Sequence, residues 1–480
     1  MAAETLKQKT AKGLFWGLVN NGTQQLLNLV FGIFLARLLT PADYGMVGML
    51  SVFSFVASSL QESGFTAALA NMKVVKCEDY NAVFWFSVSV SFLLYWILFF
   101  SAPLIAAFYD KPELVALSRY CFLSFFISSL GIAPSAYLFR NMLVKQRTKA
   151  SVVGLFISGV IGILLAYCGF SYWGIATQSL IYISVMTALV WAACPWRPTF
   201  QIDFSPLKPM IGFSSRLLFT NMFGHINNNL FSVVLGRFYS EREVGQFNQA
   251  NKWNYMGYSL ISGMVGSVAQ PLFAQIYGEE ERQARAFRKM LRFTSLISFP
   301  AMFGLSLVAP ELITIAITDK WIVSARLLQL LAINGAFVPV ISIYTQFLIS
   351  KGKSNVFMWN TVSVGVIQLF LSLLLYPYGI FTMVAVYVGV NIFWLFIWHY
   401  FVWREIRLPL LLAMKDICSY ALISLAVMIV TYVATCSIQN IYWLALSKVA
   451  LAAFLYVSVM WLSGSVTFKE CLEYVWKKRR

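Results

Sequence analysis

Residues 211–238 read IGFSSRLLFTNMFGHINNNLFSVVLGRF, a run that is apolar enough to cross a bilayer. The run nevertheless carries two Arg, one His and four Asn. Polar groups in hydrocarbon cost free energy unless they face a cavity or a partner. The stretch therefore predicts a membrane-spanning helix with one face turned toward water.

The same pattern occurs 200 positions earlier, where residues 21–45 align with residues 221–245. The polar positions follow the spacing i, i+4, i+7, which is one face of one helix. They are Asn21, Gln25 and Asn28 in the first copy and Asn221, His225 and Asn228 in the second. The repeat predicts a duplicated membrane protein whose halves meet across a polar interior. Because amide stripes also join neighbouring helices, helix packing remains the competing interpretation.

Composition assigns the chain to a class. Of 480 residues, 59% are hydrophobic and only 11% are charged, whereas a soluble protein carries about 25% charge. Apolar runs of about 20 residues, enough to span a bilayer core of about 30 Å, recur along the whole length. We therefore expect an all-α polytopic membrane protein with about fourteen spans. The expected spans are 12–36, 42–70, 81–108, 113–138, 150–169, 172–193, 207–236, 243–275, 288–309, 324–350, 356–376, 379–402, 414–434 and 441–463.

Six spans in each copy predict two six-helix lobes related as parallel repeats, followed by two additional helices. The expected parts are an N-terminal lobe at 1–195, a C-terminal lobe at 196–403, and two spans with a basic tail at 404–480. Most of the 36 Lys and Arg fall on the even-numbered loops and the tails. Positive charge marks the cytoplasmic side, so both termini are expected inside, and the net charge of +17 needs no nucleic-acid partner.

Two details of the membrane surface follow from charge placement. The segment 279–292 alternates acidic and basic residues around Phe287 and Leu291. It is expected to be an amphipathic helix lying on the inner leaflet. Single basic residues near span ends, Arg119, Arg326 and Lys448, are expected at the interface. The seven cysteines stand singly and there are only two histidines, so no metal site is expected.

Glu62 is the one acidic residue expected well inside a span. An intramembrane carboxylate is a candidate site for a coupling cation or proton. The alternative is a carboxylate paired with a neighbouring helix, and the sequence leaves both open.

Basic residues offer a second set of candidates. Arg216 lies near the inner end of the seventh span, and Lys252 shares a helical face with Asn248 and Tyr255. Fixed cations in a wet cavity attract an anionic head group, although Arg216 could instead extend to the inner surface. The equivalent residues Arg37 and Arg237 occupy matching outer ends of two spans. They are expected to anchor at the interface or to receive phosphate on the outer side.

Several short motifs occur in a characteristic order. They are ARLLTPADYG at 36–45, ESGFTAAL at 62–69, LGRFYSEREVG at 235–245, QPLFA at 270–274 and DKW at 319–321. In this order the chain resembles the Wzx-type polysaccharide flippases of the multidrug/oligosaccharidyl-lipid/polysaccharide exporter superfamily. Many drug exporters of that superfamily use an acidic residue in the first lobe for the coupling ion. Here the first span carries Asn and Gln, which leaves Glu62 as the candidate.

The resemblance implies alternating-access transport of undecaprenyl-pyrophosphate-linked oligosaccharide units across a bacterial cytoplasmic membrane. Membrane lipids and the polysaccharide polymerase machinery are the other expected partners. No cofactor and no catalysis are expected, and a proton or sodium gradient is the expected energy source where one is used. The alternative from the same superfamily is a cation-coupled multidrug exporter. A membrane glycosyltransferase or polymerase is the enzyme alternative, which would need a sizeable outer loop with catalytic groups.

Overall fold

The computed structural model describes residues 6–54, 69, 72, 75–200, 202–208, 227, 229–465, 467–470 and 473, with side chains in the first helix only from residue 22 onward. All regular elements among these residues are helices, so the all-α prediction is confirmed. By packing, the chain separates into two compact units, Met1–Gly245 and Gln246–Arg480. The boundary falls inside one helix. The predicted parts 1–195, 196–403 and 404–480 remain a prediction.

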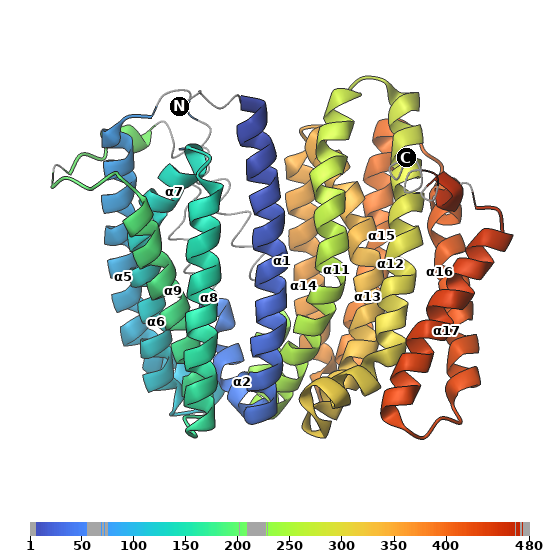
Figure 1. Ribbon diagram of the computed structural model, residues 1–480, viewed down its shortest axis with the longest axis horizontal. Coiled ribbons are helices and arrows are strands. Elements are labelled where there is room, and N and C mark those ends of the chain that lie inside the picture. The colour runs from blue at the N-terminus through green and yellow to red at the C-terminus, as the bar shows by residue number, and fades with distance from the viewer. Residues whose placement is uncertain are drawn as a thin grey trace. The chain divides into compact units, whose positions relative to one another are not determined.

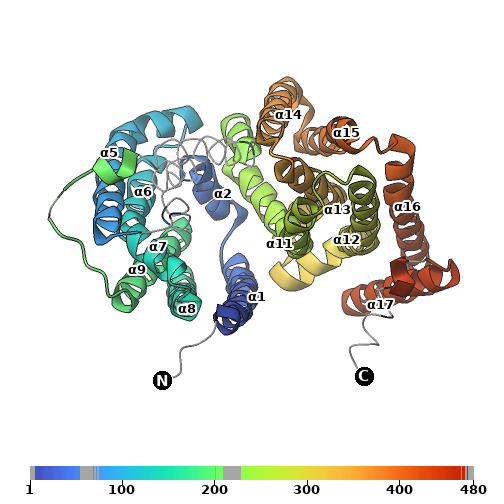
Figure 2. The same ribbon diagram turned by 90° about the horizontal axis from the view of Figure 1, so that it is seen from above.

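The first unit contains a group of long antiparallel helices (Figures 1 and 2). α8 packs against α1 and α9, and α6 packs against α5 and α9. Its elements are α1 (Leu6–Leu38), α2 (Pro41–Met49), α5 (Cys77–Tyr109), α6 (Leu114–Leu130), α7 (Ile132–Arg140), α8 (Val144–Tyr167), α9 (Tyr172–Ala193), η1 (Ser205–Leu207) and a helix at Asn229–Phe238. The first turn of α11 (Glu241–Gln275) also belongs to this unit.

The second unit is built around α12, which packs against α13, α16 and α17 (Figure 2). After α11 its elements are α12 (Glu280–Ile317), η2 (Asp319–Trp321), α13 (Ile322–Ser350), α14 (Ser354–Leu375), η3 (Tyr376–Tyr378), α15 (Ile380–Ile406), α16 (Leu410–Thr435) and α17 (Ile441–Leu462). Aromatic side chains fill the core, with the Phe273, Phe287, Tyr344 and Phe347 rings in mutual contact. Burial of rings of this size dominates the packing energy of such a unit.

Nine helices in the described part of the chain are long and apolar enough to cross a membrane, and each matches a predicted span. Two further pairs pass the same test but are bent, by 118° between Gly22–Leu38 and Pro41–Ser54 and by 43° between Leu114–Leu130 and Ile132–Arg140. α11 has the length of a span, 35 residues, but is not among the nine. The predicted count of fourteen therefore remains a prediction, whereas the multi-pass membrane architecture is confirmed.

The prediction of a separate amphipathic helix at 279–292 is wrong. These residues form the first turns of α12, which continues without a break for 38 residues. Phe287 and Leu291 are fully buried in the core of the unit. The Phe287 ring contacts Tyr344 and Phe347 of α13, so protein and not lipid covers this face of the helix.

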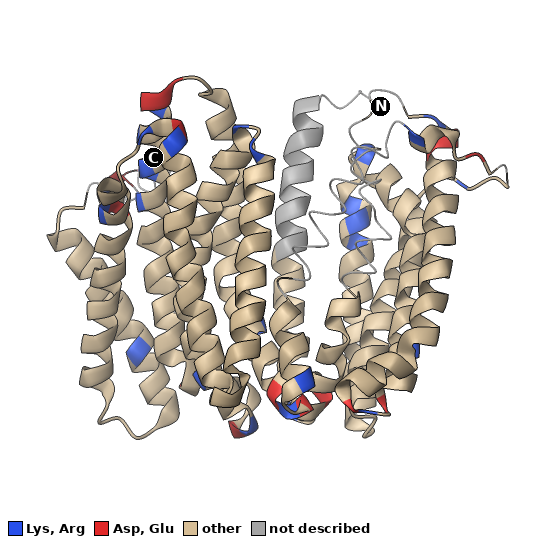
Figure 3. Cartoon of the chain, turned by 180° about the vertical axis from the view of Figure 1, so that it is seen from behind, with Lys and Arg blue, Asp and Glu red and all other residues tan. Residues whose placement is uncertain are grey.

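Charge gathers at the helix ends, while the middle of each unit is nearly free of it (Figure 3). In the second unit, consecutive antiparallel helices place the start of α12, the α13–α14 turn and the α15–α16 turn at one end. That end carries the basic residues Arg282, Arg285, Arg288, Lys289, Lys351, Lys353, Arg404, Arg407 and Lys415. The orientation predicted from the sequence depends on such an excess of basic residues at one end of the helices.

Candidate functional site

Lys252 lies on the exposed face of α11 in the second unit. Tyr255 follows on the same face with 54% of its surface exposed, and its ring centroid is 5.5 Å from that of Tyr258. Lys252 forms no hydrogen bond or ion pair with any residue that the structure describes. An accessible ammonium on the same helical face as the Tyr255 phenol is suited to a ligand that combines phosphate with hydroxyl groups.

Polar contacts fix the rotation of α11 about its axis. The Gln246 side chain donates to the backbone oxygen of Lys320 (2.8 Å) and accepts from the Ser324 amide (2.8 Å). Further along the helix, Asn254 packs so tightly on Gly335 that an added Cβ there would approach Asn254 Oδ1 more closely than real Cβ atoms do. With this face held against α13, the face that carries Lys252 is turned away from the core.

The first copy of the polar stripe is described only in part. Gln25 is half-buried and Asn28 is exposed on α1, and Arg37 is exposed in its last turn. The neighbouring Gln24 donates to Ser151 Oγ (2.7 Å), which ties α1 to α8. This bond holds α1 against α8, while Gln25 stays partly exposed and Asn28 accessible.

Most of the remaining predicted site residues lie outside the described part of the chain. They are Glu62, Arg216, Asn221, His225 and Asn228, and of Asn21 only its place in α1 is described. Their roles in the cavity and in ion coupling remain predictions.

The two copies of the repeated motif meet within the first unit, at the first turns of α2 and α11. A Cβ added to Gly45 would overlap the carbonyl oxygen of Glu241, and a Cβ added to Gly245 would overlap the carbonyl oxygen of Pro41. The contact is reciprocal. Gly45 of α2 meets Glu241, the first residue of α11, and Gly245 of α11 meets Pro41, the first residue of α2. Only glycine permits this backbone approach. We call this contact the glycine crossing.

A capping interaction precedes each helix of the glycine crossing. The Asp43 carboxylate accepts from the Thr40 amide (2.8 Å), and Thr40 Oγ1 accepts in turn from the Asp43 amide (3.3 Å). In the second copy, Glu243 accepts from the Ser240 amide (2.9 Å) and hydroxyl (2.8 Å). The first cap is reciprocal, whereas in the second the carboxylate only accepts; both satisfy the backbone N–H at the start of a helix. The repeated Thr/Ser and Asp/Glu of the motif therefore define where both helices begin.

Ionic contacts reinforce the second copy at this place. Lys111 Nζ lies 2.8 Å from Glu241 Oε2. This hydrogen bond raises the pKa of Lys111 above its ordinary value of 10.5 and lowers the pKa of Glu241 below its ordinary value of 4.5. Arg237 donates to the Phe108 carbonyl oxygen (2.6 Å), and its guanidinium lies 5.5 Å from that ring. Here Arg237 is held by the end of α5.

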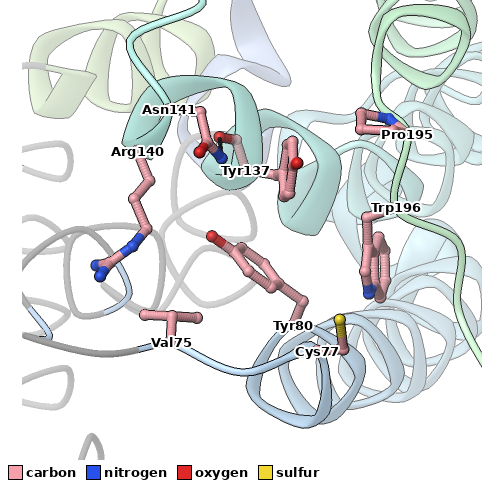
Figure 4. Close-up of a pocket in the computed structure, with 8 residues that line it drawn as sticks. All are labelled: Val75, Cys77, Tyr80, Tyr137, Arg140, Asn141, Pro195 and Trp196. Atoms are coloured by element: carbon pink, nitrogen blue, oxygen red, sulfur yellow. Dashed lines mark hydrogen bonds between the residues drawn. The ribbon is translucent and has the colours of Figure 1, made fainter.

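The first unit has a pocket of about 340 Å³ between the start of α5, the end of α7 and the segment after α9 (Figure 4). Tyr80 lies between Arg140 on one side and Trp196 on the other. Arg140 Nη1 donates to the carbonyl oxygens of Leu69 and Met72, both at 2.7 Å. The guanidinium therefore holds the chain that leads into α5, and this structural role accounts for its place in the pocket wall.

A buried ion pair joins α12 to α17. Lys448 Nζ lies 2.6 Å from Glu311 Oε1, and the two side chains are 5% and 9% exposed. The predicted place of Lys448 at the interface is wrong. The predicted ninth span ends at 309, but α12 continues through Pro310 to Ile317 and so carries Glu311 to the lysine. A lysine in the middle of an apolar span needs a partner, and that requirement is the sequence signal that could have revealed the pair.

Comparison with known proteins places these features in context. A family described as polysaccharide biosynthesis protein matches residues 34–326. The teichuronic acid biosynthesis protein TuaB of Bacillus subtilis (strain 168) is 24% identical over 361 residues, which are 74% of this chain and 74% of TuaB. The succinoglycan biosynthesis transport protein ExoT of Rhizobium meliloti (strain 1021) is 24% identical over 357 residues, 74% of this chain and 72% of ExoT.

Among solved structures, the lipid II flippase MurJ in an inward closed conformation shares the fold. The TM-score is 0.77 at 14% sequence identity, and the match covers 96% of this chain and 100% of the MurJ chain. At this identity the likeness concerns the fold alone.

Proposed function

The chain belongs to the polysaccharide biosynthesis protein family, and from this premise we propose that it moves lipid-linked oligosaccharide units from the inner to the outer leaflet of a bacterial cytoplasmic membrane. The observation that carries the proposal is the family match over residues 34–326 on a multi-pass helical membrane fold. Translocation breaks no covalent bond, so the proposed activity is that of a transporter and not of an enzyme. The drug exporter of the same superfamily is the competing outcome of the test below.

The proposed substrate is an oligosaccharide linked to undecaprenyl pyrophosphate. Its pyrophosphate and sugars are taken by polar residues, and its lipid tail stays in the bilayer. Support comes from the ammonium of Lys252, which is bonded to none of the described residues, with Tyr255 on the same face of α11. Arg216, whose guanidinium would bind phosphate in a bidentate way, is the second cation of this proposal.

The proposed cycle is alternating access, with both termini on the cytoplasmic side. In that orientation the glycine crossing lies at the outer end of the first unit, where α1 leads into α2. A close approach of two backbones, with no side chain between them, would seal the outer side while the inner side is open. A proton or sodium gradient acting through Glu62 is the proposed energy source, and the polysaccharide polymerase is the proposed recipient.

The test is complementation in the native host. The gene is deleted and restored as wild type, as Lys252→Ala, or as Lys415→Ala, which removes a lysine from α16 instead. Surface polysaccharide, trapped lipid-linked units and membrane levels of the protein are measured. We expect Lys252→Ala to lower export at least tenfold at normal membrane levels, and Lys415→Ala to restore it fully.

Two results would contradict the proposal. Full export with Lys252→Ala would exclude a role for this ammonium in binding the substrate. Normal surface polysaccharide in the deletion strain, together with altered sensitivity to cationic dyes, would assign the protein to the drug exporters.

A further inference from the structure

A second pocket, of about 420 Å³, lies in the second unit where the end of α13, the start of α14 and the end of α15 come together. Its apolar lining comes from Leu348, Val356 and Phe401. The other lining residues are Lys353, Trp403, Arg404, Glu405 and Arg407. The pocket therefore combines an apolar wall with three cations, one carboxylate and an indole.

The charges of this pocket are not balanced. The one carboxylate, Glu405, forms an ion pair with Lys353. Arg404 and Arg407 form no ion pair with any residue of the described chain. Two guanidinium groups at the same pocket without a carboxylate partner repel each other and favour the entry of an anion.

The backbone determines where Arg407 lies. It ends α15 in the left-handed conformation, with φ +51°, and its amide donates to the Trp403 carbonyl oxygen at 2.8 Å. Its guanidinium lies 5.5 Å from the centroid of the Trp403 ring, which is 39% exposed. The arginine is therefore held next to the indole at the mouth of the pocket. Tryptophan at such a position is typical of the interface between hydrocarbon and water.

We propose that this pocket binds the phosphate head group of an anionic phospholipid. Arg404 and Arg407 would hold the phosphate through their paired N–H groups, Trp403 would lie at the level of the glycerol, and Leu348, Val356 and Phe401 would contact the first carbons of the acyl chains. Basic pockets between helix ends on the cytoplasmic side bind anionic lipids in this way. The leaflet, but not the binding itself, depends on the orientation proposed above.

A free phosphate has the same anionic chemistry and is the alternative ligand. The apolar wall favours the lipid, because inorganic phosphate gains nothing from contact with Phe401 and Leu348. The two ligands therefore differ in what they need, and a competition experiment separates them.

The experiment uses the purified full chain in detergent micelles and native mass spectrometry. Phosphatidylglycerol and phosphatidylcholine with the same acyl chains are titrated in separate arms, and inorganic phosphate is added as a competitor in a third. The test variant is Arg404→Gln/Arg407→Gln. The matched control is Arg282→Gln/Arg285→Gln, which also removes two arginines, both exposed and paired with Glu279 and Glu281 outside the pocket. Gel filtration confirms that each variant is folded.

We expect the wild type to retain one more phosphatidylglycerol molecule than the test variant. Because each of the two basic residues contributes roughly 1 kcal/mol, the affinity of the wild type at this site should be about 30-fold higher. The control should behave as the wild type, and phosphatidylcholine should not distinguish the proteins. Should the test variant not fold, Arg404→Lys/Arg407→Lys keeps the charge but loses the paired N–H groups. We expect it to bind phosphatidylglycerol with intermediate affinity.

Equal retention of phosphatidylglycerol by wild type and test variant would overturn the proposal. If the glutamine variant does not fold, wild-type affinity of the lysine variant for phosphatidylglycerol would overturn it. Displacement of the lipid by millimolar inorganic phosphate would assign the pocket to a free phosphate. Export activity is not part of this readout, so failure here leaves the transport proposal untouched.

Discussion

The buried pair of Lys448 and Glu311 permits a sharp test of how this unit is held together. At 2.6 Å the Coulomb attraction of the two charges is roughly 6 kcal/mol at an effective dielectric constant of about 20. Moving both charges out of water costs several kcal/mol for each ion, so the net contribution of the intact pair is small. Removing only one partner leaves the other charge buried and uncompensated.

We therefore predict that Lys448→Met lowers the free energy of unfolding by about 3–5 kcal/mol, because the Glu311 carboxylate then lies unpaired against α17. Methionine keeps most of the volume of the lysine chain, so loss of packing contributes little. The double variant Lys448→Met/Glu311→Gln should return to within about 1 kcal/mol of the wild type, since it buries no charge.

The assay is a double-mutant cycle, with the free energy of unfolding measured by titration with sodium dodecyl sulfate from dodecyl maltoside micelles. The cycle isolates the coupling between the two side chains. A Lys448→Met variant within about 0.5 kcal/mol of the wild type would refute the reasoning. A double variant that is as unstable as the sum of the single variants would refute it as well, since the cost would then come from packing and not from charge.

Two further predictions concern the glycine crossing. Gly45→Ala or Gly245→Ala should disfavour the crossed conformation by about 1–3 kcal/mol, roughly a 5- to 160-fold change in its population. Export assays of each variant should show a loss that Gly389→Ala, at a helical glycine with open space around it, does not share. The ion pair of Lys111 and Glu241 should stabilise the fold by about 0.2–1 kcal/mol at neutral pH, since both side chains are partly exposed. Because the pKa of Glu241 is lowered, its contribution is present above the ordinary value of 4.5 and is lost as the pH falls through the lowered pKa. Because the pKa of Lys111 is raised, its contribution is present below the ordinary value of 10.5 and is lost as the pH rises through the raised pKa. Thermal unfolding of wild type and Glu241→Gln should thus differ at neutral pH and converge once the pH is below the lowered pKa of Glu241, and a difference that persists unchanged in acid would contradict this assignment.

The sequence predicts the helical class and nine of its spans, because runs of apolar residues report directly on the bilayer that they cross. It also predicts that Lys252 and Tyr255 share one face of a helix, since the spacing of polar residues on one helix is a local property. Features that depend on a partner far along the chain do not follow from local patterns. The predicted ninth span ends before Glu311. Burial of the Glu311 carboxylate is tolerable because Lys448 pairs with it, and this lysine lies 137 positions away in the sequence.

The prediction for segment 279–292 is wrong for a similar reason. Alternating charges around two apolar residues are typical of a helix at the membrane surface, and nothing local excludes this. Its place in α12 depends on α13, whose Tyr344 and Phe347 rings contact the Phe287 ring. It depends also on the carboxylate of Asp416, which accepts from Arg288 at 2.6 Å. The spacing of apolar residues shows that one face of a helix is apolar, but not whether protein or lipid covers that face.

The glycine crossing shows what the two copies of the repeat still share. In the sequence the two copies differ at some aligned positions, such as Gln25 and His225. Where backbones touch, both retain glycine, because a Cβ at either position would strike the other copy. A contact of this kind also suits a cycle of opening and closing. At the two glycines backbone meets backbone, so no side chain has to be withdrawn there when the contact opens. In the proposed cycle, groups at the rim such as Lys111 and Glu241 would stabilise the closed state only weakly, because water weakens their attraction.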